Sequence, residues 1–407
     1  MLLLLGPTCA FSRGVTEGVG RYARERGGWN LTPADGRHAP QVFGDFDGIV
    51  TATLSDDRLL ELERADPGGG GAAGDAPEGG ASGGFRGVPV VAGGSDRGAH
   101  PHASVVVDNA AVGRLAAEHL LDRGFTALAG CGPEGVFFSA QRLDAFAGAV
   151  AAAGWVAARL DGGFPFSGFS PRQAAAAPVR DWLLGLPRPV GVFAVTDNVA
   201  MSLMRLCREA GLAVPEDVAL VGVNDDGLLS AAAAPALSSV ALPGERVGHE
   251  AAAVLDAMME RPGWVPPPRR LPPLGVAARQ STDLRLTGDQ EAAAAYAYIE
   301  AHAHRRISAV DVCAQTRIAR RSLERRFKRA FGRTLNEAIL RVRLDRASTL
   351  LATTGLPVTR VAEAAGFGHM GHFYLKFKEA RGATPQAFRA RHRGSDPGAT
   401  RPGDAIA

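Results

Sequence analysis

The chain has 407 residues, which is too long for one ordinary domain and predicts two or three. Its hydrophobic fraction of 46% is typical of globular domains, and no apolar run approaches the roughly 20 residues of a membrane helix, so no membrane partner is expected. The formal net charge is only +3, but residues 283–393 carry +11 and residues 1–282 carry −7, which predicts a polyanion partner for the C-terminal part.

The first residues, Met1–Leu5, form an apolar run that could be mistaken for a secretion signal. They lack a basic leader, and the run is shorter than the roughly 7–15 residues of a signal core, so we expect a buried first strand in a cytoplasmic protein. The four cysteines, Cys9, Cys131, Cys207 and Cys313, are far apart and form no CxxC pair or Cys/His cluster. Reduced thiols are therefore expected, and neither a metal nor a cofactor.

Short apolar runs alternate with amphipathic or alanine-rich stretches over residues 1–280. This alternation predicts parallel α/β sheets whose strands are covered by helices on both faces. The expected strands are Leu2–Leu5, Gly48–Thr51, Val88–Ala92, Ser104–Val107, Ala127–Gly130, Gly191–Val195 and Val218–Val223. The expected helices are Gly14–Arg26, Asp56–Ala65, Ala110–Arg123, Ala140–Ala153, Pro171–Leu184 and Asn198–Ala210.

Three segments lack the pattern of a regular element. Residues 66–84 are rich in Gly and Ala without hydrophobic anchors, which predicts a flexible insertion in the first domain; no GxGxxG or P-loop spacing supports a phosphate-binding role. The proline-rich segment Arg261–Pro273 predicts irregular chain near the end of this domain, and residues 394–407 predict a disordered tail.

After about residue 283 the strand patterns end and helices with charged faces follow one another. A domain boundary is therefore expected there, with one domain over residues 1–282 and an all-helical domain over residues 283–393. The expected helices are Asp289–His302, Ala309–Gln315, Arg320–Ala330, Leu335–Ala352, Val358–Ala365, Met370–Ala380 and a short one over Pro385–Arg391.

Two segments of this domain have helix-turn-helix form, which is a short helix, a tight turn and a second helix with a polar outer face. In the first, Ala309–Arg329, an apolar face formed by Val310, Val312 and Cys313 precedes a turn at residues 316–318. The second helix would bury Leu323 and Phe327 and expose Arg320, Arg321, Glu324, Arg325 and Lys328. In the second unit, Val358–Lys378, the expected core residues are Val361, Ala364, Phe367, Phe373 and Phe377, with a turn at Gly366.

The helix Leu335–Ala352 joins the two units. Its 18 residues span roughly 27 Å, close to the roughly 34 Å between major-groove faces on one side of DNA. A lone basic helix would be explained better as a solvated surface, but two at this spacing in a domain of charge +11 favour DNA binding. The apolar side of the joining helix is predicted to contain Leu335, Ile339, Val342, Ala347, Leu350 and Leu351.

Residues 291–391 resemble the DNA-binding domain of the AraC/XylS family. The resemblance is carried by the sequence segments SLERRFKRAF and AGFGHMGHFYLKFKEARGATPQAFR. The resemblance implies a double-stranded DNA operator as partner. It departs from the family at Ala319 and at Gly368–His369, where a serine usually caps each reading helix. The base-reading positions fall on Arg320, Arg321, Glu324 and Arg325 in the first unit and on His369, Met370, Gly371 and Tyr374 in the second, with Lys328, Lys376 and Lys378 as further DNA contacts.

Most of residues 1–280 resemble the ligand-binding domain of LacI/GalR-type regulators, on strings such as VVVDNAAVGRLAAEHLLDRGF, GVFAVTDNVAMSLM and PEDVALVGVNDD. The resemblance implies a periplasmic-binding-protein-like fold of two α/β lobes, with a ligand between them at the carboxyl ends of the strands. The usual second helix would be compressed into Pro33–Asp47. The implied ligand-binding residues are Phe11, Ser12, Arg13, Asp108, Arg142, Asp197, Asn224 and Asp225, a set that suits a sugar.

Three of the polar residues in this region have simpler alternative roles. Asp197 could be only a helix N-cap, Asp226 a turn residue, and Arg142 the surface partner of Asp144.

Together the two resemblances imply a sequence-specific transcriptional regulator, an activator of carbohydrate-use genes, that is controlled by a small xylose-like sugar. They also imply a homodimer and leave contact with RNA polymerase open. A regulator that senses a non-sugar metabolite, or one whose sensor binds nothing, is the alternative. An enzyme or an extracytoplasmic sugar-binding protein is disfavoured, because no nucleophile elbow, metal motif or signal sequence accompanies the basic C-terminal domain.

Overall fold

The computed structural model describes residues 1–5, 9–35, 46–52, 88–94, 102–160, 176–283, 289–316, 318–331, 333–381 and 383–393. The expected helix Asp56–Ala65, the insertion 66–84 and the tail 394–407 lie outside these residues. The contacts divide the chain into two compact units, Met1–Leu286 and Thr287–Ala407.

The first unit contains two six-stranded sheets, and sheet A has the strand order β11-β5-β4-β3-β1-β2. All of its neighbouring strands are parallel, and the described side chains of β3, β4 and β5 are buried, as their uniformly apolar sequences predict. Its strands are β1 (Leu2–Leu5), β2 (Thr32–Asp35), β3 (Ile49–Ala52), β4 (Val90–Gly93), β5 (Ala103–Val107) and β11 (Arg269–Leu271).

Sheet B has the order β12-β10-β9-β8-β6-β7, in which only β12 runs antiparallel to its neighbour. The chain passes between the two sheets after β5, after β10 and after β11, which makes two lobes from one folded unit. The strands of sheet B are β6 (Ala127–Cys131), β7 (Ala157–Arg159), β8 (Val190–Ala194), β9 (Val218–Asn224), β10 (Ser238–Ala241) and β12 (Gly275–Ala277).

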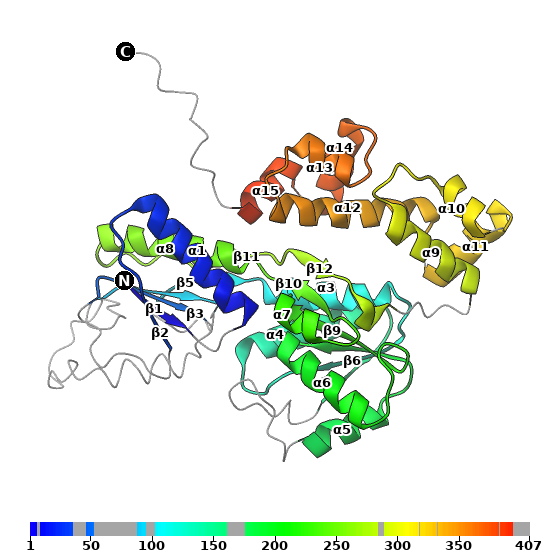
Figure 1. The fold of residues 1–407 in the computed structure, drawn as a ribbon, viewed down its shortest axis with the longest axis horizontal. Helices are drawn as coiled ribbons and strands as arrows, with labels where there is room; N and C mark the ends of the chain where they lie inside the picture. Colours follow the sequence, from blue (N-terminus) through cyan, green and yellow to red (C-terminus); the bar gives the residue numbers. More distant parts are fainter. Residues whose placement is uncertain are drawn as a thin grey trace, which may run out of the picture. The chain divides into compact units, whose positions relative to one another are not determined.

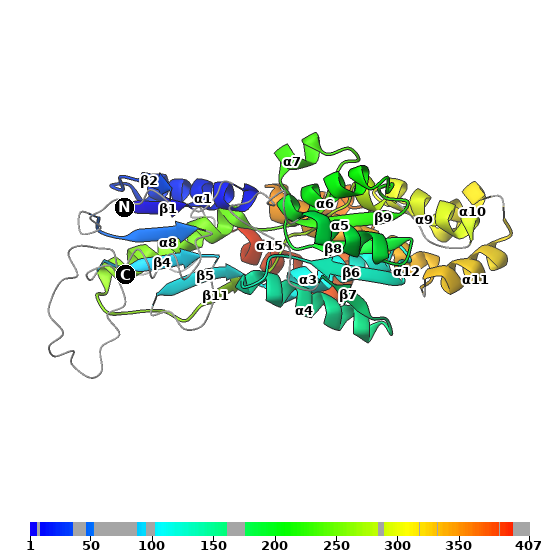
Figure 2. The ribbon, with the colours of Figure 1, turned by 90° about the horizontal axis from the view of Figure 1, so that it is seen from below.

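Helices α1 (Ala10–Arg26) and α8 (Gly244–Glu260) lie side by side in the lobe of sheet A (Figure 1). Their backbones touch, because a Cβ atom at Gly18 would lie 1.9 Å from the Glu245 carbonyl and one at Gly248 would lie 2.0 Å from the Val15 carbonyl. In the other lobe, α3 and α4 lie on one side of sheet B and α5 and α6 on the other (Figure 2). These helices are α3 (Asn109–Leu121), α4 (Phe137–Ala152), α5 (Ala176–Gly185) and α6 (Asp197–Glu209), followed by α7 (Gly227–Ala232).

The structure corrects two expectations about irregular or helical chain. Residues 32–35, where the helix of Pro33–Asp47 would begin, form β2, because the chain pairs in register with β1. The segment Arg261–Pro273 is not wholly irregular, since it contains β11, which pairs with β5. Sequence patterns also missed α8, the short α7, and strands β7, β10 and β12, which lack a long apolar run or a clear polar face.

The second unit is helical throughout its described part, as predicted. Its two helix-turn-helix units have separate hydrophobic cores. Val312 and Cys313 are buried in the first core, but Val310 is 58% exposed, so its assignment to the apolar face was wrong. The helices are α9 (Gln290–His302), α10 (Ala309–Thr316), α11 (Arg320–Phe331), α12 (Leu335–Thr353), α13 (Val358–Ala364), α14 (Met370–Arg381) and α15 (Pro385–Arg393).

Within the described residues, every helix is too short or too polar to cross a bilayer.

Candidate functional site

Helix α11 is the second helix of the first helix-turn-helix unit. Its buried side is Leu323 and Phe327, four residues apart and therefore on one face, and the Phe327 ring stacks on Tyr296 of α9 with ring centroids 5.9 Å apart. Packing of this face against α9 fixes the helix and leaves its opposite face, including Arg321 and Arg325, in solvent.

The cations of α11 fall into two groups. Arg320 donates to Glu324 over 2.8 Å, and Arg326 is paired with Asp289 and Glu291 at the start of the unit. The other cations, Arg321, Arg325, Lys328 and Arg329, are exposed and have no ion pair among the described residues. Of the base-reading residues expected in the first unit, Arg321 and Arg325 are thus the ones whose donors remain available to DNA.

Helix α14 occupies the same place in the second unit. Phe373 and Phe377 are fully buried, which turns the face with Gly371 and Lys378 outward. Lys376 is 2.7 Å from Glu379, so its predicted phosphate contact competes with an ion pair inside the helix. The expected readers Met370 and Tyr374 are partly buried, whereas His369, like Gly371, is exposed.

Helix α12 connects the two cores. Its N-terminal half contributes Leu335 and Ile339 to the first core, and its C-terminal half contributes Leu344, Ala347 and Leu351 to the second. A capping box starts the helix: the Thr334 hydroxyl accepts from the Glu337 N–H, and the Glu337 carboxylate accepts from the Thr334 N–H. Nineteen residues span about 28 Å, so one continuous helix sets the separation of α11 and α14.

In the N-terminal unit, Met1–Leu286, the predicted ligand residues lie near the carboxyl ends of the strands. Phe11 and Ser12, in the first turn of α1 after β1, are both buried; Ser12 is bonded to the backbone of Cys9. Asp108 directly follows β5 and caps α3 by accepting from the Ala111 N–H over 2.8 Å. Arg142, Asp197, Asn224 and Asp225 stand after or at the ends of β6, β8 and β9.

Arg142 is buried, and its interpretation as a surface partner of Asp144 was wrong. Its Nε donates to Asn109 over 3.0 Å and an Nη donates to the Val195 carbonyl over 2.7 Å, while Asp144 pairs with Arg159. Burial lowers the pKa of Arg142 to about 9, which still leaves a full positive charge at neutral pH. The structure thus fixes a cation between the start of α3 and the carboxyl end of β8.

Asp197 is not an N-cap, because Thr196 caps α6 by accepting from the Val199 N–H. The Asp197 side chain is buried instead, accepting from the Asp226 N–H over 2.8 Å and from the Ser239 hydroxyl over 2.6 Å. Burial raises its pKa to about 7. Its carboxyl group therefore joins the ends of β8, β9 and β10.

Asp226 is more than the turn residue that the sequence suggested. It caps α7 by accepting from the Leu228 N–H, and it also accepts from the Ala10 N–H over 3.1 Å and from Arg13 over 2.8 Å. Ala10 and Arg13 belong to α1, so this carboxylate links the two lobes at the carboxyl ends of their strands. The three adjacent polar residues after β9 were the available sequence signal for this role.

The backbone after β9 is strained. Asn224 and Asp225 have φ angles of 119° and 52°, which residues with a side chain rarely adopt. Asp225 is held by its N–H, which donates to the Ser239 hydroxyl, and by its carboxylate, which accepts from Arg279 over 2.6 Å. Sequence analysis did not single out Arg279, which lies outside the quoted motifs, or Asn109, which lies inside one but whose contact with Arg142 comes from another helix.

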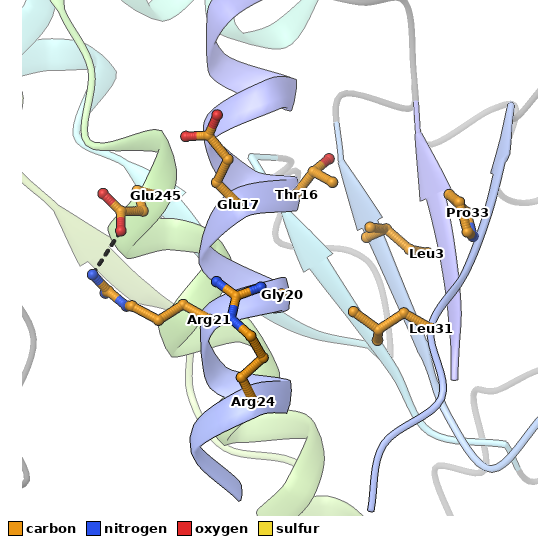
Figure 3. A pocket seen from close by; sticks show the side chains of 9 residues that line it. All are labelled: Leu3, Thr16, Glu17, Gly20, Arg21, Arg24, Leu31, Pro33 and Glu245. Carbon is orange, nitrogen blue, oxygen red and sulfur yellow. Dashed lines mark hydrogen bonds and ion pairs between the residues drawn. The ribbon is translucent and has the colours of Figure 1, made fainter. Parts of the chain in front are cut away.

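A pocket of about 450 Å³ lies elsewhere in the N-terminal unit, beside α1 and the edge of sheet A formed by β1 and β2 (Figure 3). It includes the ion pair between Arg21 and Glu245, whose atoms are 2.6 Å apart. None of the predicted ligand residues lines it. Its lining residues are Leu3, Thr16, Glu17, Gly20, Arg21, Arg24, Leu31, Pro33 and Glu245.

All four cysteines are free and buried, and the described residues contain no group of His, Cys, Asp and Glu side chains that could hold a metal ion.

Comparisons with known proteins agree with both resemblances. Residues 117–282 match the model of a periplasmic binding protein-like domain, and residues 312–391 match that of a helix-turn-helix domain. The chain is 29% identical to the xylose operon regulatory protein of Escherichia coli (strain K12), over 95% of this chain and 96% of that protein. For the Haemophilus influenzae protein of the same name the identity is 27%, over 95% and 97%.

Solved structures give the same picture. The structure of the xylose-binding transcription activator XylR is 27% identical with a TM-score of 0.55, over 95% of this chain and 97% of that one. The complex of the transcriptional regulator CelR with cellobiose is 25% identical with a TM-score of 0.53, over 69% and 84%. The expected fold class, an α/β periplasmic-binding-protein-like domain followed by a helical one, is confirmed, and the similar proteins are transcription regulators rather than enzymes.

Proposed function

Because the chain is an AraC-type helix-turn-helix transcriptional regulator with a periplasmic binding protein-like domain, we propose that a small sugar bound in that domain controls its binding to operator DNA. The sugar is xylose or a similar pentose, and the regulated genes serve carbohydrate use. The protein acts in the cytoplasm as a homodimeric activator.

The DNA-binding half of the proposal depends on one observation. Arg321 and Arg325 present guanidinium groups on the exposed face of α11 that have no ion pair in the described chain, and α12 holds this helix at a fixed distance from α14. Guanidinium groups bind guanine edges bidentately in the major groove, and phosphates hold the register. The first unit therefore supplies most of the sequence specificity, and α14 adds affinity through Lys378 and, where its ion pair opens, Lys376.

The sugar half depends on the polar groups at the carboxyl ends of the strands. Arg142, Asp197, Asn224, Asp225 and Asp108 offer donors and acceptors there, in a frame that internal hydrogen bonds already orient. Preoriented groups of both kinds suit a ligand with several hydroxyls. The similarity to a xylose-binding activator and to a regulator in complex with cellobiose supports a sugar over other metabolites.

A change caused by the ligand would be transmitted through Arg279 and the short helix Gln280–Thr282, which precede the DNA-binding domain. Arg279 binds Asp225 with one end of its guanidinium and the Leu237 carbonyl with the other, and it directly precedes the short helix Gln280–Thr282. A ligand that moves Asp225 would therefore move this segment, and typical couplings of this kind amount to about 1–3 kcal/mol.

The test is a thermal-shift screen of the full-length protein against pentoses and hexoses. We expect a pentose to raise the melting temperature of the wild type and of Arg159→Lys, an exposed arginine of the same lobe, but not of Arg142→Lys, which loses the fork between Asn109 and Val195. Equal shifts in all three proteins would refute the assignment of Arg142, and no shift with any sugar would favour a different metabolite or a sensor that binds nothing.

A further inference from the structure

The loop between α9 and α10 is fixed against the second helix-turn-helix unit. Arg343 of α12 donates hydrogen bonds to three of its carbonyl groups, those of Ala303 at 2.9 Å, Arg305 at 3.0 Å and Ile307 at 2.8 Å. The turn between α13 and α14 presses on the same loop, since a Cβ atom at Gly366 would lie 2.1 Å from the Ala303 carbonyl. By sequence the loop belongs to the first helix-turn-helix unit, but it packs against the turn between α13 and α14 of the second.

This contact places Arg306 beside the start of α14. Its Nε atom is 4.0 Å from the position that a Cβ atom would take at Gly368, two residues before the helix. The Arg306 side chain is exposed, and among the described residues it has no carboxylate or carbonyl partner. Its neighbour Arg305 is exposed as well.

In the described chain, few other cations of α13 and α14 are free to contact DNA. Arg360 pairs with Glu363, Lys376 with Glu379, and Arg381 with Asp345, which leaves Lys378 as the unpaired cation of α14 in the described chain. Among the described side chains, the surface of α13 and α14 is therefore poor in free positive charge, although α14 is the reading helix.

The surroundings of Arg306 are electropositive. Arg346 approaches from α12 and donates to the Ala364 carbonyl at the end of α13. Partial desolvation, followed by the positive charges of Arg346 and Arg305, lowers the pKa of His304. In the described chain the carboxylate that contacts the loop is that of Asp311, which accepts from the N–H and the hydroxyl of Ser308 just before α10. Arg305 and Arg306 have no carboxylate partner among the described residues, so an anion beside them would be stabilised.

We propose that Arg306, supported by Arg305, contacts DNA in addition to helices α11 and α14. It binds a backbone phosphate next to the groove occupied by α14. The inference rests on the proposed function. It assigns to the loop between α9 and α10 the phosphate contact for which the second helix-turn-helix unit offers few free cations. Arginine forms bidentate, charge-assisted hydrogen bonds with phosphate oxygens. The fixed loop backbone lowers the entropy lost when the side chain binds.

The experiment compares the full-length wild type with Arg306→Gln, Arg306→Lys and Arg360→Gln, by fluorescence anisotropy on a mixed-sequence duplex at several salt concentrations. One lost phosphate contact lowers the slope of log K against log salt by about 0.9, which amounts to roughly eightfold in affinity at about 0.1 M salt. We expect this loss in Arg306→Gln only. Arg306→Lys should keep the slope because it keeps the charge. Arg360→Gln, which loses the same charge from an ion pair in α13 of the same DNA-binding domain, should resemble the wild type.

Arg306 is exposed, so all three variants should melt with the wild type, and the melting curves check this. A slope in Arg306→Gln equal to that of the wild type would overturn the inference and leave the proposed function intact. An equal loss in Arg360→Gln would also overturn it, because net charge alone would then explain the effect. A wild type that binds no duplex in a salt-dependent way would instead contradict the proposed function itself.

Discussion

Arg325 and Arg326 are neighbours on α11 with different surroundings. Arg325 is exposed with no ion pair in the described chain, whereas Arg326 holds Asp289 and Glu291 at the start of the domain. We expect Arg325→Gln to weaken binding to a selected operator by roughly 1–3 kcal/mol and to relax its base preference. Arg326→Gln should lower the melting temperature instead and leave the base preference unchanged. Binding of an operator and of its single-base variants, together with melting curves, separates the two; reversed effects would contradict the assignment of Arg325.

Asp197 makes the stability of the first unit depend on pH. Burial raises its pKa from 3.8 to about 7, so between these values the folded protein holds a proton that the unfolded chain has lost. Stability therefore falls as the pH rises through this window and levels off above about pH 7. Asp197→Asn cannot ionise, and the melting temperature of this variant should fall less between about pH 5 and 7 than that of the wild type. The exposed Asp144→Asn should behave as the wild type does, and parallel curves for all three would show that Asp197 does not titrate there.

The place of a residue in the fold could be predicted where a sequence motif contained it. Its hydrogen-bond partners could not be predicted, because they come from other elements. The sequence placed Arg142 in a helix of the N-terminal unit and Asp197 shortly after a buried strand, and both lie there in the structure. It could not show that Arg142 is buried on Asn109 or that Asp197 holds the backbone of Asp226, because these partners come from other elements. Their role in ligand binding remains a proposal, as does that of Phe11 and Ser12, which are buried in α1.

Gly366 controls the turn between the helices of the second unit. Its φ angle of 90° and the 2.1 Å that would separate a Cβ atom from the Ala303 carbonyl both require glycine. Gly366→Ala should destabilise the C-terminal unit by about 1–3 kcal/mol or more, through a strained φ angle and a steric clash. The control is Gly371→Ala, in an exposed position of α14 where a Cβ atom meets nothing within 4 Å; it should raise helix stability by about 0.5–1 kcal/mol. Urea denaturation of both variants measures this, and a tolerated Gly366→Ala would contradict the packing of the turn.

At the scale of elements, strong periodicity was a reliable guide. The central strands of both sheets were predicted because each is a short continuous apolar run, and the C-terminal helices because apolar residues recur there at spacings of three and four. The elements that were missed depend on tertiary context. Helix α8 packs on α1 through Gly18 and Gly248, whose small size weakens any helical pattern, and β2 and β11 exist because a neighbouring strand offers hydrogen bonds.

The molecule as a whole consists of two folded units with different tasks. In the first, three chain crossings and the carboxylate of Asp226 join two lobes at the ends of their strands. In the second, α12 enters both hydrophobic cores and sets the distance between α11 and α14. The first unit can thus respond to a small ligand as a pair of lobes, and the second can engage DNA as one rigid body.

The most direct test of this account measures both tasks at once. A duplex is selected from a random pool by the full-length protein, and its affinity is measured by fluorescence anisotropy with and without the sugar that most raises the melting temperature. We predict that affinity falls steeply with salt and that the sugar changes it by about 5–150-fold, the range of a 1–3 kcal/mol coupling. Equal affinity with and without a sugar that demonstrably binds, or no salt-dependent association with any duplex, would contradict the account.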